Sequence, residues 1–252
     1  IVCVLERHLR RLKSQGCVYA EFRVSPSVWE HFGMEPEGAL DRLVNARIPG
    51  SIPYNLIVEA VRHWDRTLAE RDLGLAIRHR GKVRGFGLGG DEIAAPAENF
   101  SWLAGECRSS GLTFIPHAGE VAGPGEVLKA VEMGVKRIGH GIGAAADAVL
   151  CERLMKENIH LEVCPTSNYI TGAVRRGEEH PLKRLWERGV PFSVSTDDPG
   201  LFLTTLRREV RLASSIAGVG EGFTAILQEN ALHASLLDER EKENLRTAFF
   251  PR

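Results

Sequence analysis

The chain has 252 residues, and its 43% content of hydrophobic residues is enough for one large core. It has 32 basic and 33 acidic residues and a formal net charge of -1. It therefore lacks the positive field that would attract nucleic acids and the polybasic strip that would bind a membrane surface. We therefore predict a single domain, residues 1–252, whose partner is a small molecule rather than a nucleic acid or a membrane.

Cysteine usage and hydropathy point to a cytoplasmic protein. The five cysteines are odd in number and widely spaced, and they form no Cys-x-x-Cys pair, which favours reduced thiols over a disulfide framework. The sequence shows no signal peptide, and its apolar runs stay well below the roughly 20 residues of a membrane span. A homodimer is the one oligomeric partner that we keep open.

Helical periodicity begins directly after Ile1, and strands and helices then alternate along the chain. Strands are predicted at 17–24, 54–61, 83–88, the apolar run that leads to His117, 137–140, 159–164 and 190–195. Helices are predicted at 5–12, 35–46, 65–80, 96–110, 125–133, 146–158 and 181–188, with closing helices in 230–250.

This alternation predicts an α/β fold in which helices cover a parallel sheet. Seven strand candidates are one short of a (β/α)8 TIM barrel, and the chain starts at Ile1 without a methionine. We therefore predict a TIM barrel whose first strand lies upstream of Ile1. In such a barrel the carboxyl ends of all strands meet at one face, where active sites are built.

Polar residues follow the predicted strands at several of these carboxyl ends. Histidine and aspartate are suitable zinc ligands, and a nearby glutamate that is not a ligand can transfer protons. The residue types at these strand ends therefore indicate metal-assisted hydrolysis. A Gly-x-Ser-x-Gly elbow for an acyl-enzyme is absent from the sequence. The set comprises Asp91, Glu92, His117, Glu120, His140, Cys164, Ser167, Asn168, Asp197 and Asp198.

The glycines between Gly85 and Gly90 also match the Gly-x-Gly-x-x-Gly pattern of dinucleotide-binding loops. Asp91 and Glu92 follow directly where a phosphate-binding helix should begin, so this reading is weak. Cys164 is interpreted as a buried apolar thiol.

Four motifs in the same order resemble the adenosine deaminase family of metal-dependent hydrolases. They are His-Ala-Gly-Glu at 117–120, Gly-His-Gly at 139–141, Glu-Val-Cys-Pro-Thr-Ser-Asn at 162–168 and Ser-Thr-Asp-Asp-Pro at 195–199. The resemblance covers essentially the whole chain. It implies a zinc-bearing TIM barrel that replaces the 6-amino group of a purine nucleoside by oxygen and releases ammonia.

The resemblance also implies a role for each matched residue. His117 and Asp197 would be metal ligands, and Glu120 would protonate the purine ring while water adds at C6. His140 would orient or deprotonate that water, and Asp198 would hydrogen-bond the nucleophile or the ring. The backbone amide of Gly90 would contact the base.

The sequence departs from the family pattern in one respect, because it contains no His-x-His pair to supply two further zinc ligands. We therefore expect zinc to be weakly held or missing in a chain that starts at Ile1. The rival reading is a non-catalytic barrel that has lost its metal pair and serves in binding or assembly.

The substrate stays open between two adenine nucleosides. Gly-Leu-Gly-Gly-Asp-Glu at 87–92 and Gly-Pro at 123–124 resemble the branch that acts on aminodeoxyfutalosine, an adenosine analogue. The Cys-Pro-Thr-Ser-Asn stretch at 164–168 suits adenosine deaminases equally well.

Overall fold

The computed structural model describes residues 1–220 and 222–249, which divide into two compact units. Unit 1 comprises residues 1–91, 105–114 and the chain from Leu236 onward, and unit 2 comprises residues 92–104 and 115–235. The β-strand β4 (Thr113–Ala118) and the helix α5 (Ser101–Ser110) have residues in both units. The single domain stays a prediction, and the two units are described separately.

Unit 1 contains a parallel three-stranded ladder in which β2 is the middle strand. β2 is largely buried and mostly apolar, as expected of a parallel strand in the middle of a sheet, with Asn55 and Glu59 as its polar residues. Its elements are α1 (Val2–Ser14), β1 (Ala20–Val24), α2 (Pro26–His31), α3 (Pro36–Val44), β2 (Tyr54–Val61), α4 (Arg66–Arg78), β3 (Val83–Gly89) and α12 (Glu239–Phe249).

An ion pair inside unit 1 explains why β3 is rich in glycine. The Arg23 guanidinium lies 2.7 Å from a carboxylate oxygen of Glu59. A Cβ atom at Gly87 would lie 2.6 Å from Arg23 Nη1, and one at Gly89 would lie 2.6 Å from Glu59 Oε1. The glycines of β3 therefore make room for a charged pair, which is a different use from holding a dinucleotide phosphate.

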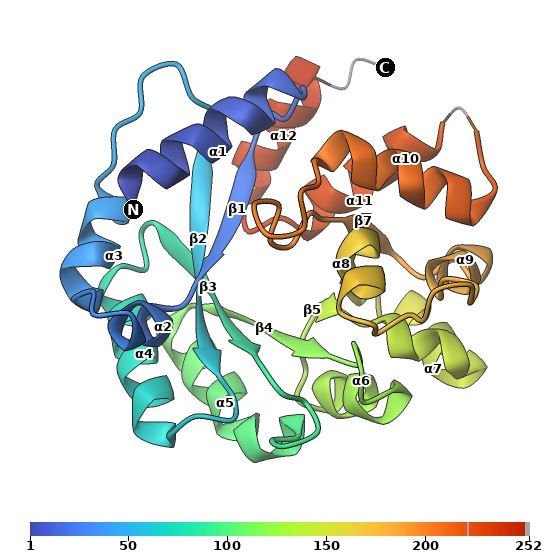
Figure 1. Ribbon diagram of the computed structural model, residues 1–252, viewed down its shortest axis with the longest axis horizontal. Coiled ribbons are helices and arrows are strands. Elements are labelled where there is room, and N and C mark those ends of the chain that lie inside the picture. The colour runs from blue at the N-terminus through green and yellow to red at the C-terminus, as the bar shows by residue number, and fades with distance from the viewer. Residues whose placement is uncertain (221, 250–252) are drawn as a thin grey trace. The chain divides into compact units, whose positions relative to one another are not determined.

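Unit 2 continues the pattern with strands β4 to β7, which pair in parallel in chain order (Figure 1). Ala118 of β4 is in register with His140 of β5, and Glu162 of β6 is in register with Ser193 of β7. Its further elements are η1 (Ala97–Phe100), α6 (Pro124–Glu132), β5 (Arg137–His140), η2 (Ile142–Ala146), α7 (Ala148–Lys156), β6 (His160–Val163), α8 (Pro165–Ile170), α9 (Leu182–Glu187), β7 (Phe192–Val194), α10 (Leu206–Ala217) and α11 (Phe223–Ala234).

The described residues contain the seven predicted strands, and the helices predicted between them are also present. Three helices were missed. The predicted strands at 17–24 and 159–164 end just before Pro26 and Pro165, and both prolines occupy the first turn of a short helix, α2 and α8, where a missing N–H group is harmless. For α10 no element was proposed. Of the predicted closing segment, Phe250 lies outside the described residues.

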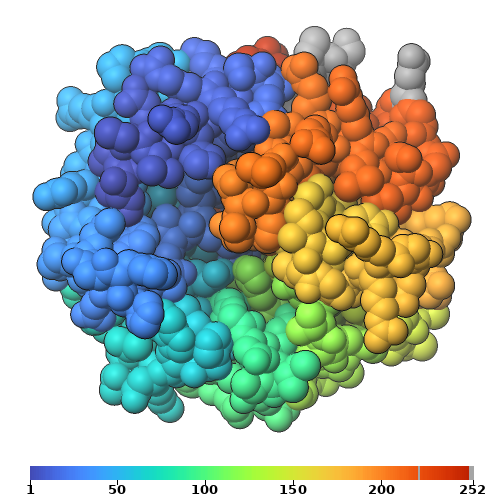
Figure 2. All heavy atoms as spheres, in the orientation of Figure 1, coloured from blue at the N-terminus to red at the C-terminus, as the bar shows by residue number. Residues whose placement is uncertain are grey.

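A buried carboxylate links α10 to the segment that contains α8. Glu209, with no exposed surface, accepts hydrogen bonds from the Thr166 N–H group at 3.0 Å and from the Thr204 hydroxyl group. The space-filling view shows α8 in yellow beside the orange surface of the α10 region (Figure 2). This link holds α8, the helix after β6 that carries Ser167 and Asn168.

Within residues 1–220 and 222–249, no helix combines the length and the apolar character that crossing a membrane requires.

Two buried histidines of unit 2 make the fold sensitive to acid. Burial lowers the pKa of His160, which shares a 2.8 Å hydrogen bond with Ser193, to about 3. Burial also lowers the pKa of His180 to about 4. Both side chains are neutral in the fold, whereas histidines of an unfolded chain take up protons below a pH of about 6.5. Their contribution to stability is present above that pH and is lost as the pH falls toward the folded values.

We expect the free energy of unfolding to fall by about 2 kcal/mol for each of these histidines between pH 7 and pH 5. His180→Gln removes one titrating group, so the variant should lose less stability than the wild type over this interval, whatever its stability at pH 7. Urea unfolding at the two pH values measures the difference. An equal loss in wild type and variant would contradict the assignment.

Candidate metal and proton-transfer site

Two paired strands of unit 2 bring His117 and His140 together. His117 is the last residue but one of β4, and His140 is the last residue of β5. The ring centroids lie 4.8 Å apart, with the rings inclined by 67°. Gly139, the register partner of His117, is required here because a Cβ atom at that position would lie 2.7 Å from His117 Cδ2. The strand sequence Ile-Gly-His thus provides both an imidazole and room for its neighbour.

Glu120 reaches the same place from the turn that follows β4. Gly119 has a φ of 70°, which glycine adopts readily, and this turns the chain so that Glu120 approaches His140. One Glu120 carboxylate oxygen lies 3.4 Å from His140 Nε2, and the other accepts a hydrogen bond of 3.4 Å from the Thr171 hydroxyl group. These contacts join β4, β5 and the end of α8.

Burial raises the pKa of Glu120 above that of an ordinary glutamate. The negative charges of Asp197 and Glu92 act in the same direction, whereas His117 and the Thr171 hydroxyl group oppose the shift. A carboxyl group with a raised pKa keeps its proton closer to neutral pH and is suited to donate it. The environment of Glu120 therefore fits a proton carrier.

His140 is held in an unfavourable backbone conformation beside a buried amide. Its φ is 57°, in the left-handed region that residues other than glycine rarely adopt. Its Nδ1 atom lies 3.3 Å from Asn168 Nδ2 of α8, and His140 is buried. Such strain persists only where the surrounding structure imposes it, and it is common at functional sites.

Asp197, which follows β7, has the same kind of backbone conformation, with a φ of 52°. A carboxylate oxygen of Asp197, a ring nitrogen of His140 and the sulfur of Cys164 all lie within 4.8 Å of one another. The next residue, Asp198, is exposed, and its carbonyl group accepts hydrogen bonds from the N–H groups of Leu201 and Phe202. Asp197 thus joins the cluster around His140.

The described residues therefore include two groups of side chains that could hold a metal ion, and His140 belongs to both. The first is His117, Glu120 and His140, and the second is His140, Cys164 and Asp197, each with its donor atoms within 4.8 Å of one another. Imidazole, carboxylate and thiolate are the donors that zinc takes in proteins, so these residues fit that ion chemically. The predicted ligands His117 and Asp197 stand in different groups.

Gly90, the predicted contact to the base, belongs to unit 1. It follows β3 with a φ of 96°. A Cβ atom at Gly90 would lie 2.8 Å from His63 Nδ1, and the same nitrogen accepts a hydrogen bond of 3.1 Å from the Asp91 N–H group. A glycine is therefore needed at this position, and its contact with a base stays a prediction.

Sequence reasoning missed the roles of three neighbours of the cluster. Thr171 was not considered, because a lone threonine after a predicted strand has no distinctive signal. Glu92 and Asn168 were noticed only as polar residues near strand ends. Their partners, at Glu120 and at His140, are distant in the sequence and become visible only in the fold.

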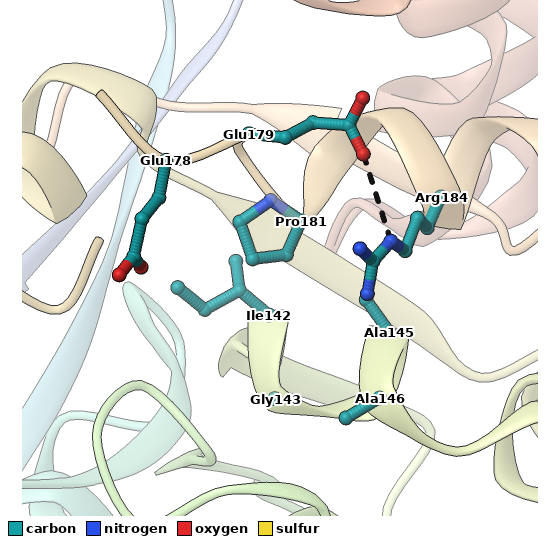
Figure 3. Close-up of a pocket in the computed structure, with 8 residues that line it drawn as sticks. All are labelled: Ile142, Gly143, Ala145, Ala146, Glu178, Glu179, Pro181 and Arg184. Atoms are coloured by element: carbon teal, nitrogen blue, oxygen red, sulfur yellow. Dashed lines mark ion pairs between the residues drawn. The ribbon is translucent and has the colours of Figure 1, made fainter. Parts of the chain in front are cut away.

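A separate pocket of about 400 Å³ lies in unit 2 between η2 and the 178–184 segment. Figure 3 shows Ile142 and Pro181 between the acidic side chain of Glu178 and an ion pair that joins Arg184 Nε to Glu179 at 3.6 Å. The predicted site residues do not line this pocket.

The sequence of residues 4–249 matches the model of the adenosine deaminase family. The chain belongs to that family. This confirms the resemblance that the four motifs indicated.

One curated relative and two solved structures illustrate what the chain is similar to. It is 34% identical over 244 residues to an aminodeoxyfutalosine deaminase from Streptomyces coelicolor. The aligned region covers 94% of this chain and 63% of that protein. The structure of an adenine deaminase from Arthrobacter aurescens is similar with a TM-score of 0.88 and 25% identity, over 97% of this chain and 76% of that one. An amidohydrolase structure with bound zinc from Burkholderia ambifaria has a TM-score of 0.90 at 23% identity, over 99% of this chain and 72% of that one.

These similarities confirm the predicted TIM-barrel fold class. The chain spans somewhat less than two thirds of the length of the Streptomyces relative.

Proposed function

We propose that this protein catalyses the metal-dependent hydrolytic deamination of a 6-aminopurine nucleoside, with adenosine and aminodeoxyfutalosine as the candidate substrates. The observation that carries the proposal is the contact of 3.4 Å between Glu120 and His140 inside a cluster of zinc-type donors. Membership of the adenosine deaminase family supports the reaction class. The family name and the Streptomyces relative support the two substrates.

The residues of this chain have distinct tasks in the proposed reaction. His117 and Asp197 would hold the zinc ion, with Cys164 close enough to His140 and Asp197 to contribute a donor. When bound, zinc would supply Lewis acidity that makes water a better nucleophile at neutral pH. Glu120 donates its proton to the purine ring nitrogen, which makes C6 electrophilic enough for attack by water.

His140 orients the attacking water or accepts its proton, and Glu120 is close enough to stabilise a charged imidazole. Asp198 hydrogen-bonds the nucleophile or the ring, and the Gly90 amide contacts the base. The proton taken from water then passes to the 6-amino group, which leaves as ammonia, and the remaining hydroxyl proton returns to Glu120 as the C6 oxygen becomes a carbonyl.

The rival proposal is a non-catalytic barrel used for binding or assembly. A protein without catalytic function would have no reason to keep Glu120 and His140 in contact, or to hold His140 and Asp197 in the left-handed backbone region. The strained, convergent geometry favours the enzyme.

The test uses the complete natural protein, expressed with zinc. We expect about one zinc ion per chain by metal analysis, as in other catalytic zinc sites, and release of ammonia from a 6-aminopurine nucleoside. Adenosine, aminodeoxyfutalosine and adenine are compared side by side, and the largest kcat/KM identifies the substrate. Less than about 0.1 zinc per chain together with no ammonia from any of them would favour the rival.

A further inference from the structure

Glu92 is a buried carboxylate of unit 2 that accepts hydrogen bonds from the turn that carries Glu120. Only 3% of the residue is exposed. Its Oε1 atom accepts a hydrogen bond from the Glu120 N–H group at 3.2 Å, and its Oε2 atom accepts from the N–H groups of Val121 at 3.3 Å and Ala122 at 3.1 Å. Three consecutive backbone donors therefore converge on one side chain.

This arrangement compensates a buried carboxylate with backbone N–H groups. A buried carboxylate is unfavourable unless hydrogen bonds replace its hydration, and bonds from N–H groups to a charged acceptor are about twice as strong as neutral ones. In the described part of the chain Glu92 belongs to neither group of potential metal donors. Its oxygens are directed to the backbone of the turn rather than to an ion.

The peptide group that joins Gly119 and Glu120 is also held from its other side. The carbonyl group of Gly119 accepts a hydrogen bond of 2.8 Å from the Gly143 N–H group, which follows β5. The peptide group before the Glu120 Cα atom is thus held at both its carbonyl and its N–H group, and the peptide group after it is held at the Val121 N–H group. Because the Glu120 side chain reaches His140 at 3.4 Å, a shift of its backbone by about 1 Å would break that contact.

We propose that Glu92 is a positioning residue for Glu120, which it fixes through the three N–H groups of the turn so that the Glu120 carboxyl group meets His140 and the substrate. This inference rests on the proposed deaminase function, because the benefit of a fixed Glu120 is proton transfer. Glu92 does not itself touch the reacting atoms.

The test replaces Glu92 with glutamine, which keeps size and shape but directs an NH2 group at backbone N–H donors. The matched control is Glu126→Gln. Glu126 is equally buried and also accepts a backbone hydrogen bond, from the Ala97 N–H group at 2.8 Å, but that bond anchors η1 rather than Glu120. Thermal unfolding of both variants establishes that they fold.

Two measurements are made. Hydrogen exchange at the amides of 120–122 is expected to accelerate by about tenfold or more in Glu92→Gln and to stay unchanged in Glu126→Gln. The value of kcat is expected to fall by about 10- to 100-fold with little change in KM for Glu92→Gln alone. In a Glu120→Gln background the further effect of Glu92→Gln should shrink to less than about threefold, because the group it positions is gone.

The inference is overturned by unchanged exchange at 120–122. It is also overturned if Glu92→Gln lowers kcat by the same factor with and without Glu120, since that result would describe a general loss of structure. If the wild-type protein releases no ammonia, the proposed function is refuted instead. The exchange measurement would then still test whether Glu92 fixes the turn that carries Glu120. Glu92→Asp, which keeps the charge on a shorter side chain, should recover part of the exchange protection.

Discussion

Glu120→Gln is expected to lower kcat by about a thousandfold, which lies within the range that general acid catalysis contributes. Glutamine fills the same space and can still contact His140 and Thr171, but it has no proton to give to a purine ring. Burial keeps the pKa of the Glu120 carboxyl group raised, so that the wild-type protein carries this proton at higher pH than an ordinary glutamate would. Steady-state ammonia release from the preferred nucleoside measures the loss.

Glu178→Gln serves as the control, because it makes the same substitution at an exposed glutamate of unit 2. It should retain wild-type kcat. The zinc content of Glu120→Gln should also remain near that of the wild type if Glu120 acts as a proton carrier. A variant that loses zinc together with activity would show that Glu120 is a metal ligand in the first donor group.

His140→Asn is expected to lower kcat by about a hundredfold or more while the protein stays folded, because a water-orienting imidazole is lost. Asparagine is chosen because it tolerates the left-handed backbone region better than most residues, and His140 has a φ of 57° there. Activity assays and urea unfolding of the same preparations separate the chemical from the structural effect.

His140→Ala provides the comparison for the backbone. Alanine is strained in this region by about 1 kcal/mol or more, so His140→Ala should be less stable than His140→Asn at a similar loss of kcat. If both variants keep most of the wild-type activity, His140 has no part in the reaction. If they are equally stable, the left-handed conformation at position 140 is not maintained in solution.

Local sequence patterns predicted the alternating elements well. The stretches 54–61 and 137–140 were predicted with the bounds that β2 and β5 have in the structure. For β2 the reason is that a buried parallel strand is mostly apolar. The patterns failed where proline begins a helix, as at Pro26 and Pro165. A proline that starts a short helix and one that ends a strand look the same in a single sequence.

Part of the candidate site was also predictable from the sequence. The residue types at the ends of β4, β5 and β7 already indicated zinc and proton chemistry, since His117, His140 and Asp197 follow apolar runs and the carboxyl ends of parallel strands share one face. The sequence by itself thus determined the class of fold, the family and the identity of the chemical groups.

Only the tertiary structure decided how these groups are supported. The carboxylate of Glu92 meets the turn at 120–122, and the amide of Asn168 meets His140, across about thirty residues of chain in each case. Hydrogen-bond partners so far apart leave no periodic pattern, because the distance between them is set by strand register and not by spacing along the chain. The left-handed backbone at His140 and Asp197 arises in the same way, from packing that overrides local preference.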